Sequence, residues 1–478
     1  MCNKLTNAPF INFGVPTFDS AKILDESAIK IIPLANQHLA NISCCAMQQA
    51  AIEFWQTHDH GLQRTWLDLF VHEFGLKTLV RMSYSATYNF KDATYLIAWQ
   101  LRLIRENVEA KIRQNLHNEG FNEKAINKIL NFINDPQKGV LSLGSCNLKK
   151  IPSIIFAHPI ASRLQTLILD FNQLEVVPAC IEKLTNLKGL NLDCNQLTSL
   201  PAEFSNLTNL STLRLEQNRF EVLPPEIFNL VNLRRLLLSS NKLTMLPAEI
   251  GNLINLVELN LDFNYLTSLP MEIGYLTNLQ KLYLSYNQFV DLTKNIFNLS
   301  NLIHLDICSN KLSFLPSELS HLTSLENLNV RTNNLTALPS EISSLINLKE
   351  LYVNQNKLTS LPSEIAFLKK LVKLNLGCNY LTELPAQITN LVNLQELQIT
   401  GNQLAVFPMV VCNLTNLISL KLSFNQLQKL PHQISSLINL EELDVSDNPL
   451  EALPPEIFNM VNLQKIDFGK NQEILPIE

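Results

Sequence analysis

The sequence predicts an α/β protein built as a solenoid, with a parallel sheet on its concave face and a small all-α domain in front of it. A motif of the form LxxLxLxxNxLxxLPxEIxxLxN recurs every 23 residues from about residue 164 onward. Residues 34–134 instead show apolar residues at helical spacing. A hydrophobic content of 46% in 478 residues is enough for a large buried core. These observations place the domain boundary between residues 1–138 and 139–478.

The all-α domain is predicted from four helical stretches within residues 1–138. These read "LANQHLANISCCAMQQAAIEFWQ", "GLQRTWLDLFVHEFGLKTLVRM", "KDATYLIAWQLRLIRENVEAKIRQNL" and "NEKAINKILNFIND". In the third stretch, Leu96, Trp99 and Val108 belong to one apolar stripe. We expect the last helix near residues 122–134 to cover the leucines of the first repeat, because the end repeats of a solenoid need capping.

Each repeat is anchored by an asparagine whose spacing never slips. The anchors are residues 172, 195, 218, 241, 264, 287, 310, 333, 356, 379, 402, 425, 448 and 471. In LxxLxL the last two leucines are two residues apart, so they point to the same face of a short strand and form the core. The asparagine amide then satisfies backbone groups where the chain turns, and stacked repeats align these amides in a ladder. Cys146 takes this role weakly in the first repeat, and the last repeat is cut short, which gives about fifteen repeats.

The segment LPxEI predicts a short helical turn on the return path of each repeat. Proline suits the first position of such a turn, and a glutamate such as Glu249 or Glu272 favours the positive end of its dipole. The proline is replaced once, in "LTKNI" at residues 292–296. This exception indicates either drift in a permissive loop or a local change of curvature.

A fixed 23-residue period with this consensus is the signature of a leucine-rich repeat. The LPxEI form, over about residues 140–478, resembles the intracellular class of Ras-group-related and Ras-suppressor proteins, which includes bacterial effector-like members. This resemblance implies protein–protein interaction, typically as a scaffold in signalling, and brings no catalytic residues with it. Effector relatives can carry a ubiquitin-ligase domain after their repeats, whereas this sequence ends inside a repeat.

Composition argues against several classes of protein. Residues 1–138 carry 14 Lys and Arg against 13 Asp and Glu, and residues 139–478 carry 23 against 30, so clustered basic residues for binding nucleic acid are not found. There is no run of about 18 apolar residues for a membrane span, and the opening residues do not resemble a secretory signal. Nine scattered cysteines without a CxxC pair suit a reducing compartment. We therefore expect a cytoplasmic protein, in its own cytosol or in that of a host.

No catalytic, metal or cofactor site is predicted. His72 and Glu73 begin a zinc-protease motif, but Leu76 stands where the second histidine is needed. The pair His58 and His60 reads as a solvated turn, since a zinc site needs more ligands. Cys44 and Cys45 lie in an apolar helical pattern, which favours inert packing over nucleophilic chemistry. No glycine-rich phosphate loop is found.

Function is predicted to reside in the variable strand positions, six, four, two and one residues before each anchor. These positions face out of the solenoid and include Leu237, Ser285 and Cys308. Aromatic anchors surrounded by charge are typical of protein-binding hot spots. The candidate protein-binding residues are Phe263, Tyr283, Tyr286, His304, Asp306, Arg331 and Tyr352. The alternative is that these aromatics only fill the pleat and stack along the sheet.

Two functions are consistent with this pattern. The favoured one is a non-enzymatic scaffold or adaptor that binds a protein partner on the concave face. The other is an effector enzyme whose catalytic unit is the N-terminal helical domain, for example in ubiquitin transfer, with repeats that select its substrate. The N-terminal residues show none of the paired groups at a spacing that catalysis would suggest, which favours the scaffold.

Overall fold

The computed structural model describes residues 106, 108–135 and 137–469. The described residues up to Lys138, with Ala157–Ile160, form one compact unit, and Gly139–Phe156 with Ala161 onward form a second. Each unit is described by itself. The helices predicted before residue 106, with Leu96 and Trp99 of the apolar stripe, lie outside the described residues.

The described part of the first unit contains two helical segments. Residues 108–118 are helical, and α6 spans Glu123–Ile133. Asn122 caps α6, since its side chain accepts a hydrogen bond of 2.9 Å from the Ala125 backbone amide. The predicted helix near 122–134 is therefore confirmed, and Val108 is fully buried. Capping of the first repeat by this domain stays a prediction.

The second unit contains a fifteen-stranded parallel sheet in which the strands follow one another in sequence order. Neighbouring strands pair with a constant offset of 23 residues, as in Leu259 with Leu282, except that β1 pairs with β2 at an offset of 26, Val140 with Thr166. The strands are β1 Val140–Ser142, β2 Thr166–Ile168, β3 Gly189–Asn191, β4 Thr212–Arg214, β5 Arg235–Leu237, β6 Glu258–Asn260, β7 Lys281–Tyr283, β8 His304–Asp306, β9 Asn327–Asn329, β10 Glu350–Tyr352, β11 Lys373–Asn375, β12 Glu396–Gln398, β13 Ser419–Lys421, β14 Glu442–Asp444 and β15 Lys465–Asp467.

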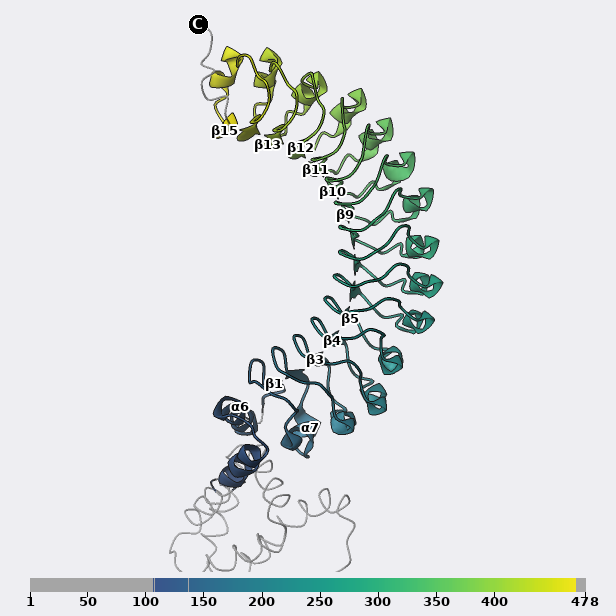
Figure 1. Ribbon diagram of the computed structural model, residues 1–478, viewed down its shortest axis with the longest axis vertical. Helices are drawn as coiled ribbons and strands as arrows, with labels where there is room; N and C mark the ends of the chain where they lie inside the picture. The colour runs from purple at the N-terminus through teal and green to yellow at the C-terminus, as the bar shows by residue number, and fades with distance from the viewer. Residues whose placement is uncertain (1–105, 107, 136, 470–478) are drawn as a thin grey trace, which may run out of the picture. The chain divides into compact units, whose positions relative to one another are not determined.

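The return path of each repeat is a short 3₁₀ helix, and the first repeat adds α7, Ile160–Arg163. Within this unit the strands lie on the inner side of an arc and the 3₁₀ helices on its outer side (Figure 1). The 3₁₀ helices are η1 Ser153–Phe156, η2 Ala179–Lys183, η3 Ala202–Asn206, η4 Pro225–Asn229, η5 Ala248–Asn252, η6 Met271–Tyr275, η7 Lys294–Asn298, η8 Ser317–His321, η9 Ser340–Ser344, η10 Ser363–Phe367, η11 Ala386–Asn390, η12 Met409–Asn413, η13 His432–Ser436 and η14 Pro455–Asn459.

The core lies between the sheet and the 3₁₀ helices, and an asparagine ladder borders it. The predicted ladder is confirmed, because all anchors from Asn172 to Asn448 are buried. Asn264 is typical: its Nδ2 donates to the carbonyl of Leu238 in the preceding repeat at 3.1 Å, and its Oδ1 accepts from the Leu243 amide at 3.0 Å. Each anchor thus joins two repeats and leaves few buried backbone groups without a partner.

The repeat without its proline keeps the same path. Thr293 stands at the proline position with φ −54°, close to the proline value, and η7 follows it as in the other repeats. Its Oγ1 donates to the Leu269 carbonyl at 2.6 Å, a bond that proline cannot make. The side-chain bond therefore holds the turn that the proline ring fixes elsewhere.

Candidate functional site

The concave face displays one residue per repeat from a strained backbone position. In all fourteen described repeats that have an anchor, the residue before it has φ between 50° and 69°. This region suits glycine, and other residues there cost of order 1–2 kcal/mol. Only Gly401 is a glycine, and the other thirteen are Ser145, Phe171, Cys194, Gln217, Ser240, Phe263, Tyr286, Ser309, Thr332, Gln355, Cys378, Phe424 and Asp447. The left-handed turn is thus a constant feature of the repeat, whichever side chain it holds.

Phe263 and Tyr286 occupy this position in neighbouring repeats and stack on each other. Their ring centroids are 4.2 Å apart and the rings are within 8° of parallel. The structure therefore contains the stacking that the alternative interpretation expects. Nevertheless, the two residues stay 51% and 45% exposed, so the pair leaves a large apolar area open to solvent.

Tyr283 and His304 form a second, less exposed ring contact beside the first. Their centroids are 4.8 Å apart with the rings tilted by 43°, and both residues are half-buried. Burial lowers the pKa of His304, against the opposing effect of the nearby Asp306 carboxylate. This histidine is therefore a neutral ring at physiological pH and not the charge that the sequence predicts around the aromatics.

Two carboxylates flank Ser285 at this point of the face. The Ser285 backbone amide donates to Asp262 Oδ1 at 2.6 Å, and the Ser285 hydroxyl donates to Asp306. Asp306 also accepts from Asn329 Nδ2 at 3.0 Å. Burial raises the pKa of Asp262 to about 7, and repulsion from Asp306 contributes to the shift. The ring of charge around the aromatics is thus weaker than the sequence suggests.

Arg331 and Tyr352 lie further along the array and have partners of their own. Arg331 Nε donates to Gln355 Oε1 at 3.1 Å. The Tyr352 hydroxyl donates to Glu350 Oε2 at 3.1 Å, and the pKa of Tyr352 is raised to about 12 by burial and by that carboxylate. The structure therefore brings five of the seven candidates together on β6–β8 and the turns after them. Arg331, after β9, and Tyr352, in β10, lie outside this group on the following repeats.

Three positions predicted to face outward are in fact buried. Leu237 is 5% exposed, and Ser285 and Cys308 are similarly covered. Leu237 lies four residues before its anchor, whereas Ser285 and Cys308 lie two before theirs, and burial at these positions varies from repeat to repeat.

Comparison with known families decides what the array is. Residues 168–265 match the family model of a leucine-rich repeat region, residues 277–335 and 346–404 match that of a leucine-rich repeat, and residues 415–456 match that of two leucine-rich-repeat copies. The solved structure of a leucine-rich-repeat protein from Leptospira interrogans is 42% identical, with a TM-score of 0.67 over 69% of this chain and 83% of that one. The chain is a leucine-rich-repeat protein.

Other solved leucine-rich-repeat structures are more distant. The internalin InlF of Listeria monocytogenes is 27% identical, with a TM-score of 0.59 over 65% of this chain and 88% of that one. The plant peptide hormone receptor RGFR1, solved in complex with RGF2, is 30% identical, with a TM-score of 0.52 over 69% of this chain and 66% of that one. No curated protein sequence matches the chain.

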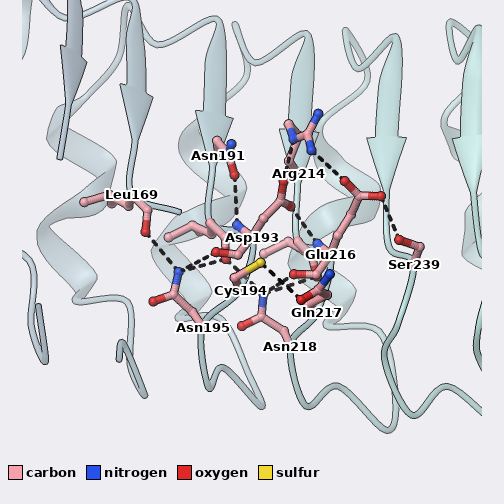
Figure 2. A network of polar contacts seen from close by, with 12 residues as sticks. Leu169, Asn191, Asp193, Cys194, Asn195, Arg214, Glu216, Gln217, Asn218 and Ser239 are labelled. Carbon is pink, nitrogen blue, oxygen red and sulfur yellow. Dashed lines mark hydrogen bonds and ion pairs between the residues drawn. The ribbon is translucent and has the colours of Figure 1, made fainter. Parts of the chain in front are cut away.

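The structure also shows a polar network on the leucine-rich-repeat array that the sequence did not predict. Arg214 Nε lies 2.5 Å from Asp193 Oδ2, and its Nη2 lies 2.7 Å from Glu216 Oε2 (Figure 2). Glu216 also accepts from the Ser239 hydroxyl at 2.7 Å. The positions of these residues in the repeat could have indicated the network. Arg214 lies four residues before its anchor, and both carboxylates lie two residues before theirs, so all three belong to the outward-facing strand positions.

Other kinds of site are not evident in the part of this leucine-rich-repeat protein that the structure describes. Among residues 106, 108–135 and 137–469, no cluster of three or more His, Cys, Asp or Glu side chains has a geometry for a metal ion. Within the same ranges, no helix has both the length and the apolar character needed to cross a membrane. His58, His60, His72, Glu73, Cys44 and Cys45 lie outside these ranges.

Proposed function

We propose that this chain is a non-enzymatic interaction protein that binds a protein partner on the concave face of its repeats. The binding centre is the set Phe263, Tyr283, Tyr286, His304 and Asp306, extended by Arg331 and Tyr352. The observation that carries the proposal is the stacked pair Phe263 and Tyr286, which stays about half exposed and is held at strained backbone positions. An exposed apolar pair costs stability, and burial of the two rings against a partner offsets that cost.

The comparisons support a protein or peptide as the partner. RGFR1 was solved in complex with RGF2, and the Drosophila protein Toll, 26% identical to this chain, in complex with Spatzle. Leucine-rich-repeat arrays typically bind proteins along an extended concave surface. The finer role that we propose is that of a scaffold or adaptor in intracellular signalling or in a host-targeted interaction, and the LPxEI form of the repeats supports it.

We place the protein in a cytosol, its own or that of a host. All six described cysteines are free thiols, which is the state expected in a reducing compartment. The effector-enzyme alternative would locate catalysis in residues 1–138. No described residue of that domain favours it over the scaffold.

The test is affinity capture from the native cytosol with the full chain, followed by quantitative mass spectrometry. We expect Phe263→Ala with Tyr286→Ala to weaken partner binding by more than about 1 kcal/mol, because exposed aromatics dominate such interfaces. The melting temperature should change by no more than about 2 °C, since neither ring is in the core.

The matched control removes two equally exposed aromatics from the outer side of the arc. Tyr275 in η6 and Phe367 in η10 are 59% and 58% exposed, so Tyr275→Ala with Phe367→Ala deletes a similar apolar area. This variant should keep the partner. Equal loss of partner in both double variants would show that the concave face is not the binding surface.

A further inference from the structure

The array contains its own example of how this concave face holds a guanidinium group. Arg214 spans two carboxylates, Asp193 on one side and Glu216 on the other (Figure 2). The contact leaves Asp193 only 4% exposed. An arginine is suited to this task because its planar fork donates to two carboxylates at once.

Three periods of 23 residues further along, the same positions hold a carboxylate without a base. Asp262 takes the position of Asp193, but Tyr283 takes that of Arg214, and Ser285 takes that of the second carboxylate. The backbone arrangement is unchanged, since the parallel register continues through these strands without a bulge. The chain therefore repeats the backbone of the arginine site, with Tyr283 in place of the arginine and Ser285 in place of the second carboxylate.

Asp262 is partly exposed, whereas Asp193 is buried. Among the residues that the structure describes, the only hydrogen-bond donor to the Asp262 side chain is the Ser285 backbone amide at 2.6 Å. Within the described residues no Lys, Arg or His lies within 4.0 Å of its carboxylate, and Arg235 on the preceding strand pairs instead with Glu258 at 2.7 Å. Burial raises the pKa of Asp262 to about 7, and no neighbouring cation opposes the shift.

A second carboxylate and the stacked rings complete the surroundings. Asp306 accepts from the hydroxyl of Ser285, and Asp262 accepts from the Ser285 backbone amide, so two acidic groups flank this residue. Phe263 directly follows Asp262, and Tyr286 directly follows Ser285, which places the exposed ring pair next to the carboxylates. Carboxylates beside aromatic faces are the surroundings that a guanidinium prefers.

We propose that the concave face binds its protein partner through an arginine of that partner, whose guanidinium pairs with Asp262 and Asp306 as the guanidinium of Arg214 pairs with Asp193 and Glu216. The guanidinium pairs with Asp262 and packs against Phe263 and Tyr286. This inference rests on the proposed function and assigns the chemistry of the partner: an extended, basic protein segment with arginine at the contact.

The experiment is a selection of displayed random dodecapeptides on the immobilised full chain, read by sequencing. Arginine should be enriched at least about threefold over the unselected library, because a charge-assisted pair is among the strongest polar contacts. A selected peptide should bind about tenfold more weakly when its arginine is replaced by the neutral isostere citrulline. The same loss is expected with Asp262→Asn, and with Tyr283→Arg, which supplies the missing cation from within the chain.

The matched control is Asp447→Asn, which removes an exposed concave carboxylate in a distant repeat and should leave the affinity unchanged. Peptides that depend on Phe263 and Tyr286 but contain no enriched arginine and ignore Asp262→Asn would overturn this inference and leave the proposed function standing. Enrichment of lysine in place of arginine would overturn it as well. Peptides indifferent to the aromatic pair would refute both proposals.

Discussion

The asparagine ladder allows a sharp test, because the repeats contain two asparagines of very different burial. Asn287 is 8% exposed, and its Nδ2 donates to the carbonyls of Leu261 at 2.9 Å and Leu284 at 3.1 Å. Its Oδ1 accepts from the Leu266 amide at 3.0 Å. Asn278, in the same repeat, is exposed and makes one bond, to the Ile254 carbonyl at 2.9 Å.

Asn287→Ala should cost roughly 2–4 kcal/mol of unfolding free energy. The Leu266 amide would be left in the core without a partner, which alone costs about 1–3 kcal/mol, and two buried carbonyls would lose a donor. Asn278→Ala should cost less than about 1 kcal/mol, because water can replace its single exposed bond.

The measurement is chemical unfolding followed by circular dichroism, together with native-state hydrogen exchange at the Leu266 amide. Exchange is needed because repeat arrays can unfold in parts, so that one midpoint does not describe the whole chain. Exchange at Leu266 should accelerate in Asn287→Ala and stay as in wild type in Asn278→Ala. Similar losses of stability in the two variants would refute the view that the anchor amides hold the repeats together.

Two further predictions concern Asp262 and Gly274. The folded state holds a proton on Asp262 up to about pH 7, whereas the unfolded chain releases it near pH 4. This carboxyl therefore contributes stability that is fully present below pH 4 and is lost as the pH rises through 7. The loss is at most about 1.4 kcal/mol per pH unit. The unfolding free energy of the wild type minus that of Asp262→Asn should therefore fall from pH 5 to pH 8. A difference that does not change with pH would contradict the raised pKa of Asp262. His304, whose pKa is lowered, has the opposite pH dependence, but it is present in both proteins and cancels in the difference. Gly274→Ala should lower the melting temperature, at a cost of about 1–3 kcal/mol, because its added Cβ would lie 2.8 Å from the Asn295 backbone oxygen, whereas Ser320→Ala at the equivalent position should not.

The repeats could be predicted from the sequence because every unit contains the same pattern of core leucines and, from the second unit onward, the same asparagine anchor. Anchors spaced by 23 residues correspond to a parallel register offset by 23, and the longer step from Cys146 to Asn172 corresponds to the offset of 26 between β1 and β2. In a solenoid, contacts are made between adjacent units, so periodicity in the sequence translates directly into periodicity in space.

The site was predictable only in outline. The register placed Phe263 and Tyr286 next to each other and outside the core, as found. The left-handed backbone at these positions was not predicted, because propensity assigns that region to glycine. The burial of Leu237 and Ser285 was also missed, since the repeat pattern alone assigns these strand positions to the outward face. The lack of a cationic partner for Asp262 among the described residues was not predicted, because it depends on where nearby basic side chains such as Arg235 pair.

The unvarying register has a consequence for how such a chain can change its length. If one block of 23 residues in the middle of the array were removed or duplicated, the strands on the two sides of the new junction could still pair. The reason is that strands such as β9 Asn327–Asn329 and β10 Glu350–Tyr352 present the same backbone pairing groups to their neighbours. Every backbone bond and every ladder contact would form again across the new junction. Unequal recombination can therefore lengthen or shorten the surface offered to a partner while each surviving unit keeps its fold.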